Sequence, residues 1–271
     1  MDETYQGAVI HLGAAQLVIA ACLVLVSGLV SMALRLDLER RLALAATRTV
    51  VQLLLIGYVL RFVFDLDKPA PVLALMACMV FAASRAAVGR SRRTFRGATG
   101  LAFLTLALSG FVTTFTVTTA IVGVEPWYRP QYTIPLLGMV LGNGLTGISL
   151  CLDQLLEVLV ERRAEVETEL ALGASRWEAA RGPLADAVRR GMIPIVNSMM
   201  VVGIVSLPGM MTGQILANAD PLDAVRYQIV VMFMLAAATS LGCILLALLV
   251  YRRCFNARHQ LVTDLITLRK S

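Results

Sequence analysis

Charged residues are scarce in this sequence: Asp, Glu, Lys and Arg make up 15% of 271 residues, whereas soluble globular domains carry roughly a quarter. Lysine is nearly missing, because Lys68 and Lys270 are the only two. A nucleotide-binding P-loop requires Gly directly before its Lys, and here the lysines follow Asp67 and Arg269. The low charge excludes an ordinary soluble domain. The missing motif excludes ATP hydrolysis by a P-loop in this chain.

Histidine and cysteine are also few and show no ligand spacing. The two histidines, His11 and His259, lie near the ends of the sequence, so neither supplies the mid-membrane base that an intramembrane enzyme would need. The five cysteines form no C-x-x-C pair and are predicted to be small core residues rather than metal ligands or disulfides; they are Cys22, Cys78, Cys151, Cys243 and Cys254. We therefore predict no catalytic residues, no certain metal ligands and no cofactor in this chain, and a protein that is not an enzyme.

Long apolar runs dominate what is present. Hydrophobic residues make up 58% of the chain, the mean hydropathy is +0.77, and a helix needs roughly 20 apolar residues to cross a bilayer. The sequence predicts an all-α, multi-pass protein of the cell membrane, the inner membrane if bacterial, with about seven transmembrane helices. The predicted spans are Val9 to Leu34, Leu42 to Phe64, Ala70 to Val88, Ala98 to Val124, Tyr132 to Leu152, Met192 to Leu216 and Val225 to Tyr251.

The distribution of positive charge predicts the orientation of these spans. With the N-terminus outside and the C-terminus inside, all but four of the 24 Lys and Arg residues lie on the cytoplasmic side, the exceptions being Arg61, Lys68, Arg129 and Arg226. Cytoplasmic loops carry such an excess of basic residues. The net charge of +6 is therefore explained by topology, and no nucleic-acid partner is predicted.

One connection is long enough for structure of its own, within what we predict to be a single transmembrane domain over residues 1–271. It runs from about Asp153 to Gly191 and contains the polar stretch "AEVETELALGASRWEAARGP", about 164–183. Residues 165–181 favour a helix, and Val166, Leu170, Gly173 and Trp177 form a narrow apolar stripe on it. Gly173 is costly inside a helix. Beside Ala174 and Ser175 it indicates a tight contact or a bend between two short helices.

Polar groups inside the predicted spans are candidates for a transport route, because such groups are expensive in lipid. Pro208 and Gly209 loosen the sixth span, and the thioethers of Met210 and Met211 are soft ligands that suit Cu(I) better than hard cations. Interhelical hydrogen bonds and ordinary methionine packing are the alternative explanations. The candidates are Arg48, Gln52, Asn143, Pro208, Gly209, Met210, Met211, Gln214 and Gln228. Gly138 and Gly142 form a G-x-x-x-G pattern, which is typical of helix packing.

Two sets of motifs resemble known permeases. "ETELALGASRW" at 167–177 resembles the EAA loop of ABC transporter permeases: Glu167 and Gly173 match its Glu and Gly, although Thr168 and Glu169 stand where two Ala are usual. The stretches "GMVLGNGLTGISL" (138–150), "VSLPGMMTGQILANADPLDAVRYQIVVMFML" (205–235) and "YRRCFNARHQLV" (251–262) resemble FetB-type ABC permeases, in the same order over nearly the whole chain. That family comprises metal-export permeases, with plant relatives linked to aluminium tolerance.

The resemblance implies a homodimeric permease that exports metal ions, iron among them, and is driven by a separate FetA-like ATP-binding subunit, which binds ATP and Mg. It also implies that the polar stretch is a coupling helix inserted into that subunit, with Val166, Glu167, Leu170, Gly173, Ala174 and Trp177 on it. An organic cargo such as a nucleotide sugar is the alternative. A secondary transporter would leave the polar helix without a role, and we found no internal repeat typical of inverted-topology transporters.

Overall fold

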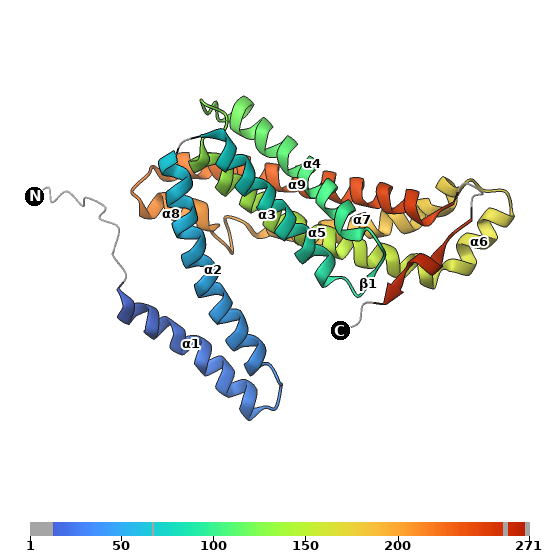
Figure 1. The fold of residues 1–271 in the computed structure, drawn as a ribbon, viewed down its shortest axis with the longest axis horizontal. Helices are drawn as coiled ribbons and strands as arrows, with labels where there is room; N and C mark the ends of the chain where they lie inside the picture. Colours follow the sequence, from blue (N-terminus) through green and yellow to red (C-terminus); the bar gives the residue numbers. More distant parts are fainter. Residues whose placement is uncertain (1–12, 67, 257–259, 269–271) are drawn as a thin grey trace, which may run out of the picture.

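The computed structural model describes residues 13–66, 68–256 and 260–268, and these are almost entirely helical (Figure 1). The elements in chain order are α1 (Ala14–Ala33), α2 (Glu39–Leu66), α3 (Pro69–Arg90), β1 (Arg93–Thr94), α4 (Ala98–Thr116), the π-helix η1 (Val117–Ile121), α5 (Pro130–Glu161), α6 (Arg163–Ala171), α7 (Arg176–Val201), α8 (Gly209–Leu216), α9 (Pro221–Cys254), the 3-10 helix η2 (Thr263–Leu265) and β2 (Thr267–Leu268).

Six helices in the described part of the chain are long and apolar enough to cross a membrane. They are α1 to α5, with η1 continuing α4, and α9. Most lie within a few residues of the predicted spans, but α5 continues to Glu161, well beyond the predicted end at Leu152. Its extra turns bury Leu155, Leu156 and Leu159, so packing against neighbouring helices extends it past the apolar run. The prediction of an all-α, multi-pass membrane protein is confirmed.

The sixth predicted span, Met192 to Leu216, is wrong as a continuous helix. Instead α7 begins upstream at Arg176, ends at Val201, and is followed by a non-helical segment, 202–208, before the short α8. Gly203 has φ +84°, a left-handed conformation that glycine adopts without steric cost, and Pro208 stands directly before α8 as its N-cap. Figure 1 shows α7 alongside α5 and α9, with α8 at the far end from α6. This broken pair therefore takes the place of one span.

The predicted polar helix over 165–181 is also two helices. α6 ends at Ala171, and Gly173 has φ +95° with open space where a Cβ would lie, which is the usual glycine geometry after a helix end. Ser175 starts α7 with a capping box: its hydroxyl accepts from the Glu178 N–H at 3.3 Å, and its own N–H donates to the Glu178 carboxylate at 2.8 Å. The sequence left two explanations for Gly173, a tight contact or a bend between two short helices, and the structure shows the bend. Pro183 lies inside α7 and does not end it.

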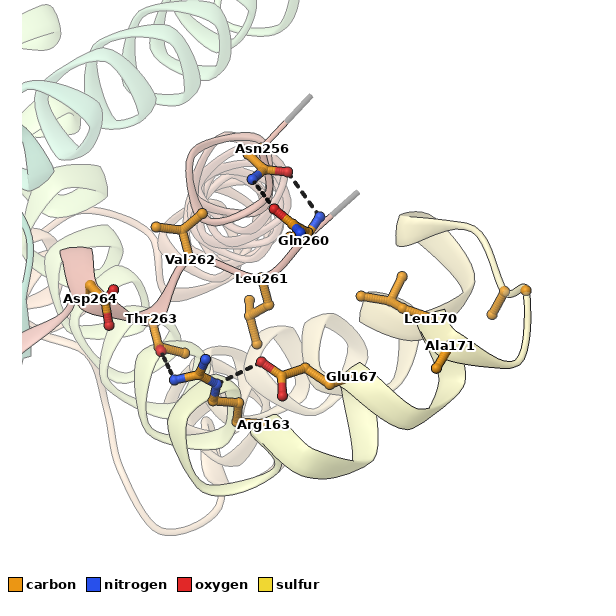
Figure 2. Close-up of a pocket in the computed structure, with 12 residues that line it drawn as sticks. Arg163, Glu167, Leu170, Ala171, Asn256, Gln260, Leu261, Val262, Thr263 and Asp264 are labelled. Atoms are coloured by element: carbon orange, nitrogen blue, oxygen red, sulfur yellow. Dashed lines mark hydrogen bonds and ion pairs between the residues drawn. The ribbon is translucent and has the colours of Figure 1, made fainter. Parts of the chain in front are cut away.

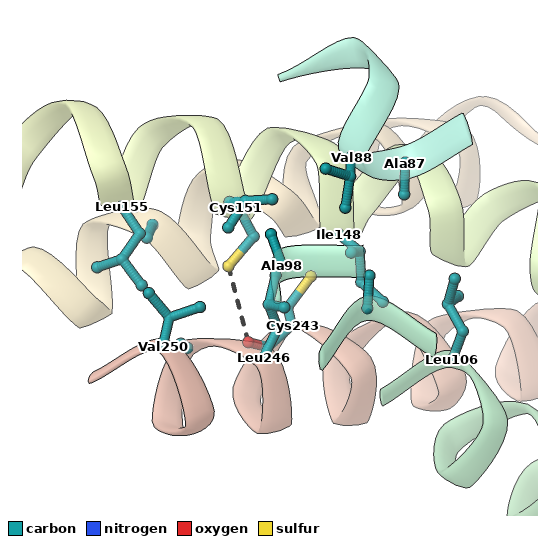
Figure 3. Close-up of a cluster of buried hydrophobic side chains, with 14 of the residues drawn as sticks. Ala87, Val88, Ala98, Leu106, Ile148, Cys151, Leu155, Cys243, Leu246 and Val250 are labelled. Atoms are coloured by element: carbon teal, nitrogen blue, oxygen red, sulfur yellow. Dashed lines mark hydrogen bonds between the residues drawn. The ribbon is translucent and has the colours of Figure 1, made fainter. Parts of the chain in front are cut away.

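The core forms where α5 packs against α3, α4, α7 and α9. Figure 3 shows Leu155, Leu246 and Val250 among the side chains that fill the space between α5 and α9. In the same cluster the Cys151 thiol donates to the carbonyl oxygen of Cys243 at 3.7 Å. Cys151, Cys243 and Cys254 are buried, as predicted for core residues, whereas Cys22 and Cys78 are exposed.

Two glycines bring three helices unusually close together. A Cβ added to Gly191 of α7 would lie 2.7 Å from Cys243 Sγ, 2.8 Å from the carbonyl oxygen of Gly147 and 2.9 Å from Cys151 Cβ. The G-x-x-x-G pair is less confined. A Cβ on Gly138 would meet Met79 at 3.4 Å, and one on Gly142 would meet nothing within 4 Å. The close approach is thus made by glycines of different helices.

The α1–α2 hairpin lies apart from this bundle. Figure 1 shows it projecting away from α3 to α9, and α2 meets the bundle mainly through α3 and α5 at its far end. The turn between α1 and α2 is closed by Ser31, whose hydroxyl accepts from the Leu38 N–H and donates to Glu39, both at 3.1 Å. Nearly all apolar side chains of the hairpin are exposed and are therefore available to lipid.

Gly191→Ala is expected to lower the free energy of unfolding by about 1–3 kcal/mol, because the new methyl group meets backbone and helices must shift. Gly142→Ala is the matched control: it lies in open space and should be neutral or stabilise by up to about 1 kcal/mol through helix propensity. Denaturant unfolding of both variants in the same detergent measures the difference. Equal midpoints would show that α5, α7 and α9 are not tightly packed at Gly191.

Candidate functional site

The turn between α6 and α7 forms the tip of one end of the molecule. Leu172, directly before Gly173, is 84% exposed. The predicted apolar stripe packs largely within the chain itself: Val166 is buried, Leu170 packs against the core, and the Trp177 ring meets the Tyr251 ring edge-on at 5.8 Å. Sequence reasoning missed Leu172. An apolar residue directly before a glycine in a polar stretch was the available signal.

A groove of about 860 Å³ separates α6 from the segment that follows α9 (Figure 2). Arg163 bridges the two sides of the groove: its Nε donates to Glu167 at 2.7 Å and its Nη1 donates to the Thr263 hydroxyl at 2.9 Å. The Glu167 carboxylate raises the pKa of Arg163 above its ordinary value. Glu167, which matches the Glu of the EAA loop, therefore helps to hold α6 to the C-terminal segment. Ala174 lines the same groove.

The C-terminal segment also joins the α3–α4 connection at this end. β2 pairs antiparallel with β1, with Thr267 opposite Thr94. The carboxylate of Asp153 on α5 accepts from the Ser91 hydroxyl at 3.0 Å and from the Arg92 N–H at 2.7 Å. These contacts join the α3–α4 connection, α5 and the C-terminal segment, so the α6–α7 turn projects from a braced base.

The capping box at Ser175 fixes the start of α7 beside this turn. Hydrogen bonds from the Ser175 N–H and hydroxyl lower the pKa of the Glu178 carboxyl below its ordinary value, so the group is ionised at neutral pH. An ionised carboxylate in the first turn also interacts favourably with the helix dipole. The direction in which α7 leaves the turn is therefore well defined.

Two cavities lie at the opposite end, on either side of α8. The first, of about 470 Å³, lies between η1, α5, α8 and α9 and is lined by Met139, Met210, Gln214 and Tyr227, among others. The Gln214 carbonyl oxygen is buried there and has no hydrogen-bond partner within the described residues.

The second cavity, of about 430 Å³, lies between the 202–208 segment, α7, α8 and α9. It is lined by Met199, Met211, Gln228 and Met232 together with apolar neighbours. Gln228 is only 6% exposed, and its carbonyl oxygen likewise finds no partner in the part of the chain that the structure describes. The adjacent Met210 and Met211 thus line different cavities, and each cavity contains one glutamine with a free carbonyl oxygen.

The remaining candidates for the route lie elsewhere. Arg48 and Gln52 are exposed on α2, and Asn143 donates to the Met139 carbonyl of its own helix at 3.1 Å. Pro208 and Gly209 form the start of α8. Sequence reasoning missed Met139, Met199 and Met232, since a methionine that lines a cavity has the same sequence signature as one that fills a core.

Acidic, thiol and imidazole groups do not converge in the described residues: no three or more His, Cys, Asp or Glu side chains come close enough to hold a metal ion. His11 and His259 lie outside those residues. Within residues 13–66, 68–256 and 260–268, the polar groups that line the two cavities beside α8 are therefore amides and, in one cavity, tyrosine hydroxyls, together with the thioethers of methionine.

Comparisons with known proteins were made for the whole chain. A family model described as "Uncharacterised protein family (UPF0014)" matches residues 14–255. "UPF0014 membrane protein slr1647" of Synechocystis sp. is 40% identical over 84% of this chain and 88% of its own length. "Probable iron export permease protein FetB" of Escherichia coli is 34% identical over 91% of this chain and 93% of its own. "Protein ALUMINUM SENSITIVE 3" of Arabidopsis thaliana is 32% identical over 92% of this chain and 89% of its own length. No solved structure matches.

Proposed function

The chain belongs to the UPF0014 family of membrane proteins, and from this premise we propose that it is the permease subunit of an ABC exporter that carries metal ions out of the cytoplasm. Iron is the proposed cargo, because the Escherichia coli relative is named a probable iron export permease. The observation that carries the proposal is the α6–α7 turn, which presents an exposed Leu172 at the end of a braced polar base.

A separate ATP-binding subunit, which binds ATP and Mg, is the proposed partner of this turn. The chain has no P-loop of its own. α7 has 26 residues and so is about 39 Å long at 1.5 Å per residue, which joins the turn directly to the 202–208 segment and the cavities beside α8. Movement of the docked turn would therefore reach the proposed cargo route through one helix.

In this proposal the α6 end faces the cytoplasm. The α3–α4 connection, α6 and the end of α9 all lie at that end (Figure 1). They carry the positive charge expected of cytoplasmic loops, with Arg90, Arg92, Arg93, Arg96, Arg162, Arg163, Arg252 and Arg253.

A second copy of the chain is the proposed cover for the 202–208 segment. Ile204 is 89% exposed there and Val205 is also exposed, and the non-helical segment joins α7 to α8, both of which pack on the long apolar helix α9. In this proposal the segment lies at membrane depth. Irregular backbone at membrane depth is tolerated where protein buries it or where it lines a water-filled cavity. A homodimer in contact through this segment meets that requirement and places the cavity that the segment lines, with Met199, Met211 and Met232, near the dimer interface.

Leu172→Asp is expected to abolish most of the co-purification of the ATP-binding subunit and the ATPase activity stimulated by Fe(II), because it places a charge at the centre of the proposed contact. Leu222→Asp is the matched control and should retain both, because Leu222 is also an exposed leucine, at the start of α9. Neither side chain is packed, so both variants should fold.

Wild-type affinity of Leu172→Asp for the ATP-binding subunit would contradict the coupling role of the turn. Stimulation of the wild-type complex by a nucleotide sugar instead of Fe(II) would retain the ABC permease and replace the cargo with an organic solute.

Single cysteines at Glu169 and Ala219 are expected to report the orientation. Both positions are exposed. Neither side chain caps a helix, whereas the nearby Ser175 and Asp220 do and are therefore left unchanged. A membrane-impermeant maleimide applied to intact cells should label Ala219→Cys, whereas Glu169→Cys should react only after permeabilisation. The parent chain, which has neither substitution, measures the background labelling. Labelling of Glu169→Cys in intact cells would reverse the proposed orientation.

Ile204→Cys is expected to cross-link two copies under mild oxidation in membranes, in a background with Cys22→Ser and Cys78→Ser to remove the exposed native thiols. Leu108→Cys, exposed on α4, is the control and should remain monomeric on a non-reducing gel. Equal cross-linking at both positions, or none at Ile204, would argue against a dimer formed through the 202–208 segment.

A further inference from the structure

We propose that the cavity lined by Met199, Met211, Met232 and Gln228, called the methionine cavity below, is a binding site for a soft monovalent cation of the Cu(I) type. The proposal goes beyond the proposed function and does not depend on it, because the cation that this cavity would hold differs from the iron proposed as cargo. It concerns the cavity of about 430 Å³ between α7, α8, α9 and the 202–208 segment.

The four side chains come from three helices that converge at the break. Met199 lies two residues before the end of α7, Met211 lies in the first turn of α8, and Gln228 and Met232 lie four residues apart on α9. Residues at i and i+4 share one face of a helix, so α9 presents an amide and a thioether together. A movement of α7 or α8 relative to α9 would change the distances between these groups.

The buried amide indicates a ligand rather than ordinary packing. Gln228 is nine-tenths buried, and its carbonyl oxygen lacks a hydrogen-bond partner in the described chain. A buried acceptor without a partner costs about 1–3 kcal/mol, a penalty that a leucine at this position would avoid. A cation bound among the thioethers would satisfy that oxygen.

The donor set selects the class of cation. Thioethers are soft ligands that favour Cu(I), whereas Mg²⁺ and Ca²⁺ require several hard oxygen ligands. None of the residues that line the methionine cavity is charged, so a monovalent ion leaves less uncompensated charge there than a divalent one. The cavity on the other side of α8 has two methionines, a half-buried Gln214 and two tyrosines, and is a less suitable site for a soft cation.

The test uses the purified chain in detergent, without the ATP-binding subunit and with its methionines replaced by selenomethionine. Cu(I) is titrated against a competing chelator, and X-ray absorption at the selenium edge reports any copper neighbour. We expect one Cu(I) with a selenium neighbour. Met211→Leu combined with Met232→Leu conserves volume, should keep the melting temperature, and should weaken binding by about tenfold or more, or about 1.4 kcal/mol.

Three further variants refine the test. Gln228→Leu should also weaken Cu(I) binding, whereas Met200→Leu, beside the cavity but exposed, and Met210→Leu, in the other cavity, should not. Copper bound without a selenium neighbour would place it on ligands other than methionine and overturn the proposal, as would equal affinity for Fe(II) or Mg²⁺, or no binding. None of these results depends on the Leu172→Asp experiment, so failure of this site and failure of the ABC permease assignment are distinguishable.

Discussion

The contact between Gly147 and Gly191 is the constraint on which the rest of the structure depends. At this point α5 and α7 approach so closely that a methyl group on either glycine would meet the carbonyl oxygen of the other, and Cys243 of α9 closes the third side. α7 is thereby held between two long membrane helices although its own sequence is only partly apolar. The α6–α7 turn is attached to one end of α7, and the 202–208 segment and α8 to the other, so the position of both candidate functional regions follows from where α7 is held.

The hydropathy of the sequence was sufficient to predict six spans, because a helix that crosses lipid must be long and composed mainly of apolar residues. The prediction failed for the sixth run because hydropathy does not register backbone conformation: residues 192–216 are predominantly apolar, yet Gly203 and Pro208 interrupt the helix. Hydropathy also did not predict that α7 begins at Arg176. That start was readable from Ser175 and Glu178, which have capping-box spacing, but the continuous helical propensity on both sides of Gly173 concealed it.

The sequence indicated which types of residue form the candidate site, but it did not indicate which of them line the same cavity. Gln214 and Gln228 stood out as amides within apolar runs, and the structure places each in a cavity with its carbonyl oxygen free. The separation of Met210 from Met211 depends on the rotation of α8, and the contribution of Met199 and Met232 depends on helix register. The same limit explains the glycines: G-x-x-x-G is a pattern within one helix, whereas the tight contact joins Gly147 and Gly191, 44 positions apart and on different helices.

The prolines of α7 suggest how a docked turn could act on the cavities. Pro183 and Pro194 lie inside α7 on either side of Gly191, and each removes one backbone hydrogen bond, which allows a helix to bend. In the proposed mechanism α7 is held at Gly191 and can bend on both sides of it, at Pro183 and at Pro194. Displacement of the turn near Leu172 therefore tilts the other end of α7, where Met199 lies. α8 packs chiefly on α9, and no residue of α7 lines the cavity that contains Met210. Such a tilt would therefore move Met199 relative to Met211 and Met232 and change the methionine cavity. One helix movement would then alter the ligands of the methionine cavity and leave the cavity on the other side of α8 unchanged.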